Sequence, residues 1–271
     1  MVKKLFKHEI LSYLRLWLPT QIILFAVALF MRLILFFESE HVVYGIVFGS
    51  SVFMYVMAIL ASIGITFVFG IVRFYKNLFT REGYLTFTLP VSPMAHIFVK
   101  LFTASLFSVL TWLSIMVTGV IVTSGELLAE IFKAAGFMWN EAYKEIGFSL
   151  VFYILEFLIL MFVSSLASYL LYYTCIAIGQ MFKKNRVLAA FGVYFVYYVV
   201  NQIFSTVITV FFAIFANQWE PIFESIGVFA EAHPHAFVHI MLLGSTVITA
   251  LLGALYFFIT HLIIRKKLNL E

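Results

Sequence analysis

Six long apolar runs, separated by shorter polar segments, dominate the pattern of the chain. A helix needs about 20 predominantly apolar residues to cross a bilayer, and each run reaches that length, so several spans are expected to tilt or to extend beyond the membrane. The pattern predicts an all-α polytopic membrane protein, with one transmembrane domain over residues 1–271. The predicted spans are Leu16–Phe37, Val42–Val72, Ile97–Thr123, Phe148–Gln180, Val187–Ala216 and Ile240–Ile264.

The first 15 residues have a different pattern, with apolar and basic positions on opposite sides of a helix. Val2, Phe6 and Ile10 recur at helical spacing, while Lys3 and Lys7 fall mostly on the other side. This pattern predicts an N-terminal amphipathic helix in the membrane interface. A basic start that only orients the first span explains the lysines but not the apolar stripe.

Two polar connections between predicted spans also contain helical spacing. Residues 124–147 and 217–239 both carry aromatic and aliphatic side chains at intervals of three and four. We expect short helices there, lying on the outer leaflet or dipping into it. No internal repeat and no separate soluble domain is expected.

Composition agrees with a membrane protein. Hydrophobic residues make up 64% of the chain and charged residues 11%, against about 25% charged residues in soluble domains. The net charge of +4 does not indicate nucleic-acid binding, because its distribution matters more than its sum. One cysteine, Cys175, excludes an intramolecular disulfide.

The basic residues assign an orientation. With the N-terminus inside, the inner segments hold 14 of the 17 lysines and arginines, which places both termini in the cytoplasm by the positive-inside rule. Nine glutamates fall outside. The inner basic residues are Lys3, Lys4, Lys7, Arg15, Arg73, Lys76, Arg81, Lys100, Lys183, Lys184, Arg186, Arg265, Lys266 and Lys267; the outer acids are Glu38, Glu40, Glu126, Glu130, Glu141, Glu145, Glu220, Glu224 and Glu231.

Motifs for catalysis are missing from the sequence. No GxxxxGK[ST] phosphate-binding loop occurs, no HExxH, and no aspartate at all. We therefore predict that the chain is not an enzyme, has no ATPase motif and binds no cofactor of its own. His233, His235 and His239 share an outer segment with Glu231, but this loose spacing is weak for a metal site, and none is predicted.

Polar residues inside the spans are candidates for a substrate path or for helix pairing. Glu156 lies in span 4 and Arg32 in span 1, at similar depths from the outer side. Charges within a span face protein or a wet cavity, so these two are candidates for an intramembrane ion pair, structural or functional. Asn201 and Gln202, in the middle of span 5, either line a polar path or hold helices together, with the second reading favoured.

The inner segment Arg73–Lys100 is basic and aromatic. Ser92 followed by Pro93 predicts the start of the third span, by an N-cap hydroxyl and a proline at the first helical position. Upstream, Thr80 is a candidate cap for a short helix over 81–87. Apolar side chains on the cytoplasmic side mark a contact surface. The candidate contact residues are Arg81, Glu82, Tyr84, Leu85, Phe87 and Leu89.

The run FYKNLFTREGYLTFTLPVSP, between spans 2 and 3 of a six-span chain ending in KKLNLE, resembles the permease subunits of ABC-2-type exporters of Gram-positive bacteria. The resemblance implies a coupling helix in this run that docks on a separate cytoplasmic ATPase, which binds ATP and Mg²⁺. It also implies permeases that work in pairs in the bacterial plasma membrane, with an interfacial helix at Lys3–Arg15 and outer helices before the last span.

These observations predict a permease subunit that moves a hydrophobic or amphipathic substrate outward, such as a drug, an antimicrobial peptide or a lipid. Its partners would be ATPase subunits, a second permease and lipid, with no nucleic acid. Two alternatives stay open. One is a self-powered secondary transporter or channel, which would normally show broken helices or more midplane charge. The other is the membrane-embedded binding subunit of a vitamin importer.

Overall fold

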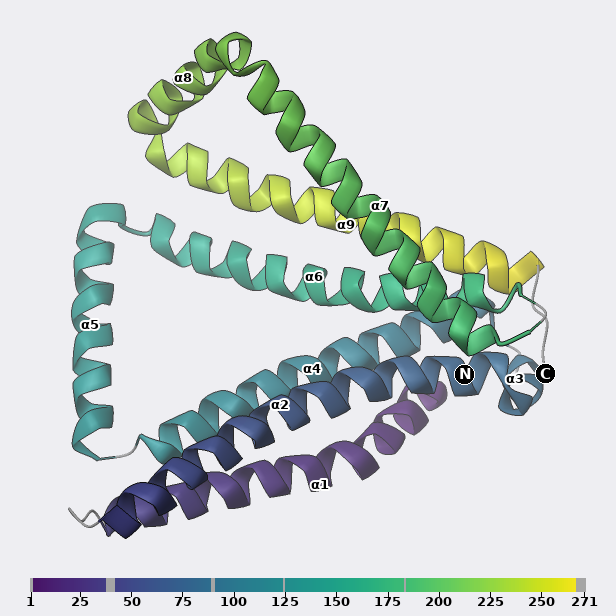
Figure 1. Cartoon of the computed structure of the whole chain (residues 1–271), viewed down its shortest axis with the longest axis horizontal. Helices are drawn as coiled ribbons and strands as arrows, with labels where there is room; N and C mark the ends of the chain where they lie inside the picture. The colour runs from purple at the N-terminus through teal and green to yellow at the C-terminus, as the bar shows by residue number, and fades with distance from the viewer. Residues whose placement is uncertain (1, 38–41, 89–90, 124, 183, 267–271) are drawn as a thin grey trace. The chain divides into compact units, whose positions relative to one another are not determined.

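In the computed structural model, residues 2–37, 42–88, 91–123, 125–182 and 184–266 are described, and every regular element among them is an α-helix (Figure 1). Leu89, Glu38, Glu40, Lys183 and Lys267, which entered the predictions above, lie outside these ranges. The helices are α1 (Val2–Phe36), α2 (Val42–Phe79), α3 (Arg81–Thr88), α4 (Pro93–Val122), α5 (Glu126–Ile146), α6 (Ser149–Gly179), α7 (Arg186–Ile214), α8 (Ala216–Ala232) and α9 (Pro234–Lys266).

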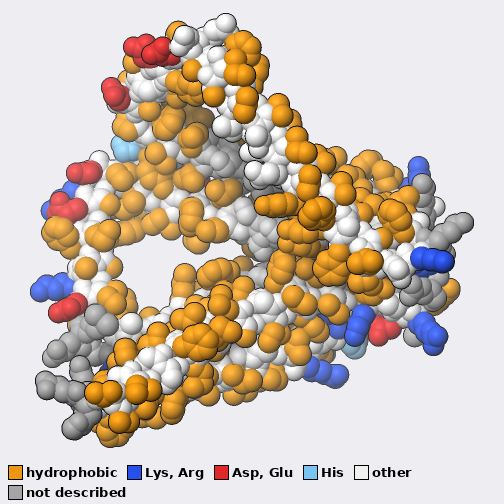
Figure 2. Space-filling model, in the orientation of Figure 1, with side chains coloured by type: hydrophobic (Ala, Val, Ile, Leu, Met, Phe, Trp, Pro, Cys, Tyr) orange, Lys and Arg blue, Asp and Glu red, His pale blue; other side chains and the backbone are white. Residues whose placement is uncertain are grey.

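Six of these helices are long and apolar enough to cross a membrane: α1, α2, α4, α6, α7 and α9. The expected all-α, multi-pass membrane fold is confirmed at this level. Each of the six contains most of one predicted span, because an uninterrupted apolar run of this length satisfies its backbone polar groups only as a helix in lipid. Apolar side chains cover the long helices in the space-filling view (Figure 2).

The N-terminal segment differs from the expected separate interfacial helix. Helix α1 runs without a break from Val2 to Phe36 and includes Pro19. Glu9 and Tyr13, in its first half, are buried. The side of α1 that carries these two residues therefore faces protein. Residues 2–15, predicted as an interfacial helix, and the first predicted span form one continuous helix.

The chain divides into two compact units, which we describe separately. Unit 1 comprises Met1–Leu78 and Leu85–Lys144, and unit 2 comprises Phe79–Tyr84 and Glu145–Glu271. Helix α5 carries the chain from the first unit to the second. The predicted outer connections at 124–147 and 217–239 contain α5 and α8, and α5 is longer than the short helix expected there.

Unit 1 is built on α1 and α4, which α2 joins through side-chain contacts. Tyr13 of α1 packs between Phe69 of α2 and Phe107 of α4, each with a ring-centroid distance of 4.9 Å. One and two turns further along α1, Trp17 donates a hydrogen bond to Thr111 (2.8 Å), and the Gln21 amide donates to the Ser62 hydroxyl (2.9 Å). Apolar packing and a few polar contacts therefore set the register of the three helices.

Unit 2 is organised around α6, which packs along α9 and against α7. The Thr174 hydroxyl of α6 lies 3.0 Å from the Thr260 hydroxyl and 3.0 Å from the Tyr256 carbonyl of α9. Near the end of α6, an added Cβ at Gly179 would lie 2.7 Å from the Ala190 nitrogen of α7. Glycine is needed here because the two backbones approach too closely for a side chain.

Candidate functional site

Helix α3 lies between the end of α2 and the start of α4, as predicted for the short helix of the inner segment. It begins at Arg81, and the Gly83 amide donates to the Thr80 carbonyl over 2.8 Å. Arg81 and Glu82 are exposed, Gly83 is buried, and 55% of Tyr84 is exposed. The side chains of Leu85 and Phe87 and all of Leu89 lie outside the described part of this candidate surface.

The start of α4 follows the predicted cap. Ser92 is the N-cap in extended conformation (φ −65°, ψ 147°), its side chain accepts a hydrogen bond from the Ala95 amide, and Pro93 occupies the first helical position. Proline fits there because its missing N–H has no partner in the first turn of a helix. The cap ends the connection that carries α3 and fixes where the third span begins.

A buried ionic cluster, formed by Glu9, Arg73 and Lys100, links three helices of unit 1. The Arg73 guanidinium donates twice to the Glu9 carboxylate, from Nε to Oε1 (2.6 Å) and from Nη2 to Oε2 (3.1 Å). Lys100 Nζ donates to Oε1 over 3.1 Å. Only 4% of the Glu9 side chain and 6% of the Lys100 side chain are exposed. One carboxylate thus accepts hydrogen bonds from two cations at a largely buried position.

The cluster joins the start of α1 to the two helices that flank α3. Arg73 lies in the last two turns of α2, and Lys100 in the second turn of α4. His96, one turn before Lys100, is also buried. The cluster thus ties the N-terminal helix to both helices that flank α3 in the chain.

This cluster was not predicted from the sequence. Glu9 is separated from Arg73 by 64 residues and from Lys100 by 91, so no local spacing connects them. The available signal was that Glu9 is the only acid among the basic residues of the first 15 positions. A single acid among many basic residues is a candidate for an ion pair, and this would have identified Glu9.

In unit 2, Glu156 has a partner that the sequence did not predict. Its Oε1 lies 2.7 Å from His239 Nδ1, with 14% of the Glu156 side chain and 29% of the His239 side chain exposed. Tyr153, one turn before Glu156, contacts His235 through its hydroxyl (2.9 Å to Nδ1) and packs on the His239 ring at 4.7 Å. Glu156 Oε2 is buried with no hydrogen-bond partner among the described residues.

Among the described residues of unit 2, neither Asn201 nor Gln202 forms a hydrogen bond with Glu156. Arg32 belongs to unit 1, where its Nη2 would lie 3.3 Å from a Cβ added at Gly125. Asn201 donates to the Tyr197 hydroxyl of its own helix over 3.3 Å, and both Asn201 and Gln202 are exposed on α7. The Tyr197 hydroxyl in turn lies 3.0 Å from the Tyr256 hydroxyl of α9, so Asn201 is linked to α9 through Tyr197.

Two of the three histidines near the start of α9 take part in polar contacts with α6. His235 and His239 lie one turn apart on α9 and face Tyr153 and Glu156 of α6. Among the described residues, no group of three or more His, Cys, Asp or Glu side chains is placed to hold a metal ion.

No protein-family model, curated protein or solved structure matches the chain. The fold defines the protein as a multi-pass α-helical membrane protein, and its function must be argued from the residues and contacts given above.

Proposed function

We propose that the chain is the membrane-spanning permease subunit of an ATP-driven ABC-2-type exporter in the bacterial plasma membrane. In this proposal both termini are cytoplasmic, and a separate ATPase binds ATP and Mg²⁺ and supplies the energy. The chain itself carries no catalytic residue. Its cargo is a hydrophobic or amphipathic molecule that leaves the cell.

The observation that carries the proposal is α3, an eight-residue amphipathic helix between two membrane-crossing helices. It begins with the charged pair Arg81 and Glu82 and exposes the ring of Tyr84. A short helix with an exposed aromatic, next to the ends of long helices, is suited to fit a groove on a partner protein. On the inner side, the partner required for energised transport is the ATPase.

The buried ionic cluster supports a mechanical role for α3. Arg73 and Lys100 lie in the two helices that flank α3, and both bind Glu9. When the ATPases close and pull on α3, the ends of α2 and α4 move, and α1 moves with them through the cluster. The helices of unit 1 then tilt together rather than singly, which is the movement that opening toward the outer side requires.

The polar middle of α7 supports the use of permeases in pairs. Asn201 and Gln202 are exposed on a helix that has no fully buried residue. Polar side chains within a span usually face protein or a wet cavity. A second permease copy, or a path lined by two copies, provides that environment for α7.

Purification of the wild-type protein from its native membranes tests the proposal. The expected result is a complex that contains an ATPase and hydrolyses ATP, with phosphate release as the measurement. Transport driven by the isolated chain in liposomes under an ion gradient, without nucleotide, would instead identify a self-powered transporter. Net uptake of a small molecule by the ATPase complex would identify an importer subunit.

A further inference from the structure

One stripe of α1 is exposed from Lys4 to Ile22 and changes along its length from basic to apolar. Its residues recur at intervals of three and four, so they lie within about 80° of the helix circumference. The three apolar side chains of the stripe are between 45% and 59% exposed. The stripe comprises Lys4, Lys7, Leu11, Arg15, Leu18 and Ile22.

The stripe faces away from the other helices of unit 1. Glu9 and Tyr13 lie on nearly the opposite side of α1, and both are buried. Glu9 accepts hydrogen bonds from α2 and α4, and Tyr13 packs between aromatic rings of the same two helices. These contacts fix the rotation of α1 about its axis and turn the stripe outward.

The basic part of the stripe lies at the depth of the lipid headgroups. The apolar run of α1 begins at Leu16, directly after Arg15, and such a run marks the hydrocarbon core. Beside the start of α1, helix α4 exposes Phe98 and Phe102, and Phe6 packs on the Phe102 ring with 5.7 Å between centroids. Aromatic side chains are enriched where headgroups meet the acyl chains.

Two cations of the stripe converge on one level. Lys7 and Arg15 each lie four residues from Leu11, which is about 6 Å along the helix axis. Long basic side chains extend along apolar surface and keep the charged end among polar groups, so both cations reach the level of Leu11. Glu9, the only acid of the first 15 residues, binds Arg73 and Lys100 on the other side of the helix. It therefore does not neutralise the stripe.

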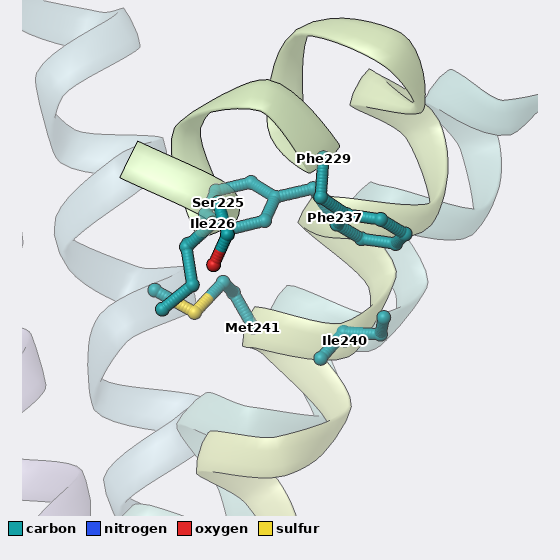
Figure 3. A pocket seen from close by; sticks show the side chains of 6 residues that line it. All are labelled: Ser225, Ile226, Phe229, Phe237, Ile240 and Met241. Atoms are coloured by element: carbon teal, nitrogen blue, oxygen red, sulfur yellow. The ribbon is translucent and has the colours of Figure 1, made fainter. Parts of the chain in front are cut away.

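A second exposed apolar surface, the groove between α8 and α9 of unit 2, gives a contrast (Figure 3). Its described lining contains no charged side chain, so it does not distinguish an anionic from a neutral headgroup. The lining residues are Ser225, Ile226, Phe229, Phe237, Ile240 and Met241. The stripe of α1, by comparison, combines apolar and basic side chains in the order in which a phospholipid presents its chains and its headgroup.

We propose that the stripe of α1 binds an anionic phospholipid whose phosphate lies between Lys7 and Arg15. An acyl chain extends along the exposed apolar side chains from Leu18 to Leu29. This stretch rises about 17 Å, close to half of the roughly 30 Å hydrocarbon core. Attraction to the two cations selects an anionic headgroup over a zwitterionic one. Binding needs no ATPase and does not rest on the proposed transport function.

Native mass spectrometry of the purified chain in detergent tests the site, by titration with phosphatidylglycerol or phosphatidylcholine of identical acyl chains. We expect the wild type to bind phosphatidylglycerol at least fivefold more tightly. Lys7→Gln combined with Arg15→Gln should weaken phosphatidylglycerol binding at least threefold and leave phosphatidylcholine binding within twofold.

The matched control is Lys133→Gln combined with Lys144→Gln, which removes the same charge from exposed positions of α5 in the same unit. Both of its lipid affinities should stay within twofold of wild type, and the melting temperatures of the two double variants should agree. Equal affinities of the wild type for the two lipids, or equal losses in the two variants, would overturn the proposal. The basic side chains would then be assigned to an acidic surface of a partner protein.

Two further measurements separate a lipid from a soluble phosphate compound. Raising ammonium acetate from 0.1 to 1 M shortens the screening length from about 10 to about 3 Å and should reduce the preference for phosphatidylglycerol at least threefold. An unchanged preference would contradict selection by charge. Glycerol 3-phosphate in hundredfold excess should not displace the bound lipid, because it lacks the acyl chains that contact the stripe. Displacement would show a site for soluble phosphates and refute the lipid.

Discussion

Glu9 connects α1 to both α2 and α4 through charged hydrogen bonds. Its carboxylate accepts a bidentate pair from Arg73 and a third bond from Lys100, with most of its surface buried. Charge-assisted, bidentate contacts are the stronger kind of hydrogen bond. Burial of an ion pair adds little net stability when compared with apolar residues, but removal of one partner leaves charge without compensation. Glu9 therefore matters most for keeping three helices in one arrangement.

Glu9→Gln should destabilise the protein by roughly 3 kcal/mol, because two largely buried cations lose a carboxylate charge that both of them bind. The matched control is Glu141→Gln, which removes an exposed carboxylate 2.7 Å from Lys144. A surface pair of this kind is worth about 0–1 kcal/mol. The free energy of unfolding of both variants is measured in the same detergent. Equal small losses would show that the cluster does not stabilise the arrangement of the three helices.

Glu156 should be coupled to His239. Glu156→Gln and His239→Gln should each destabilise unit 2, and the double variant should lose less than the sum, with a coupling energy of about 0.5–3 kcal/mol. A parallel cycle of His239→Gln with Glu224→Gln, an exposed carboxylate of α8 in the same unit, serves as control and should give additive losses. Thermal unfolding of the six proteins measures both cycles. Additivity of Glu156→Gln with His239→Gln would contradict the pair.

Residue-scale prediction from the sequence succeeded where a local pattern was enough. The hydroxyl of Ser92 and the ring of Pro93 define a helix start by themselves, and the structure has that start. The partners of Glu9 and Glu156 depend on contacts across 64 to 91 residues. A single sequence identifies such groups as unusual but does not identify what they touch.

At the scale of elements, the close approach of α6 and α7 gives a sharp prediction. Gly179→Ala should cost about 1–3 kcal/mol, because its Cβ would lie 2.7 Å from the Ala190 backbone nitrogen and the helices must separate. Gly192 of α7 has no atom within 4 Å of an added Cβ. Gly192→Ala should therefore be neutral or stabilising by up to about 1 kcal/mol, through helix propensity. Thermal melts of the two variants decide this, and equal destabilisation would contradict the packing.

The six long helices were predictable because hydrophobic length alone determines them. The continuity of α1 was not, because the first half of that helix is held by Glu9 and Tyr13 against helices that follow much later. The length of α5 was underestimated for a related reason. Its residues are mostly exposed, so contacts with other helices do not set its extent, and the apolar spacing of residues 124–147 indicated a helix without indicating its length.

At the scale of the whole molecule, the basic residues predict which ends face the cytoplasm. In a Cys175→Ser background, a cysteine at Gln218 should react with an impermeant thiol reagent added to intact cells. A cysteine at Asn185, between Lys184 and Arg186, should react only after the membrane is opened, because positive segments stay inside. Labelling of Asn185→Cys but not Gln218→Cys in intact cells would invert the topology.

The central claim is that α3 binds the ATPase, and co-purification of that ATPase with variants of α3 tests it most directly. Tyr84→Ala combined with Phe87→Ala removes two aromatic groups from the proposed interface. Aromatic anchors commonly contribute 2 kcal/mol or more, which corresponds to about thirtyfold in affinity. Tyr143→Ala, an exposed tyrosine on α5, is the control. Glu82→Gln should be mild, since an ion pair at an exposed rim adds little.

The account predicts that the double variant is inserted in normal amounts but retains little or none of the ATPase and of its ATP hydrolysis, while Tyr143→Ala behaves as wild type. If the aromatic side chains only rest in the lipid interface, the double variant will still carry the full amount of ATPase. That result would contradict the coupling role of α3 and with it the proposed function.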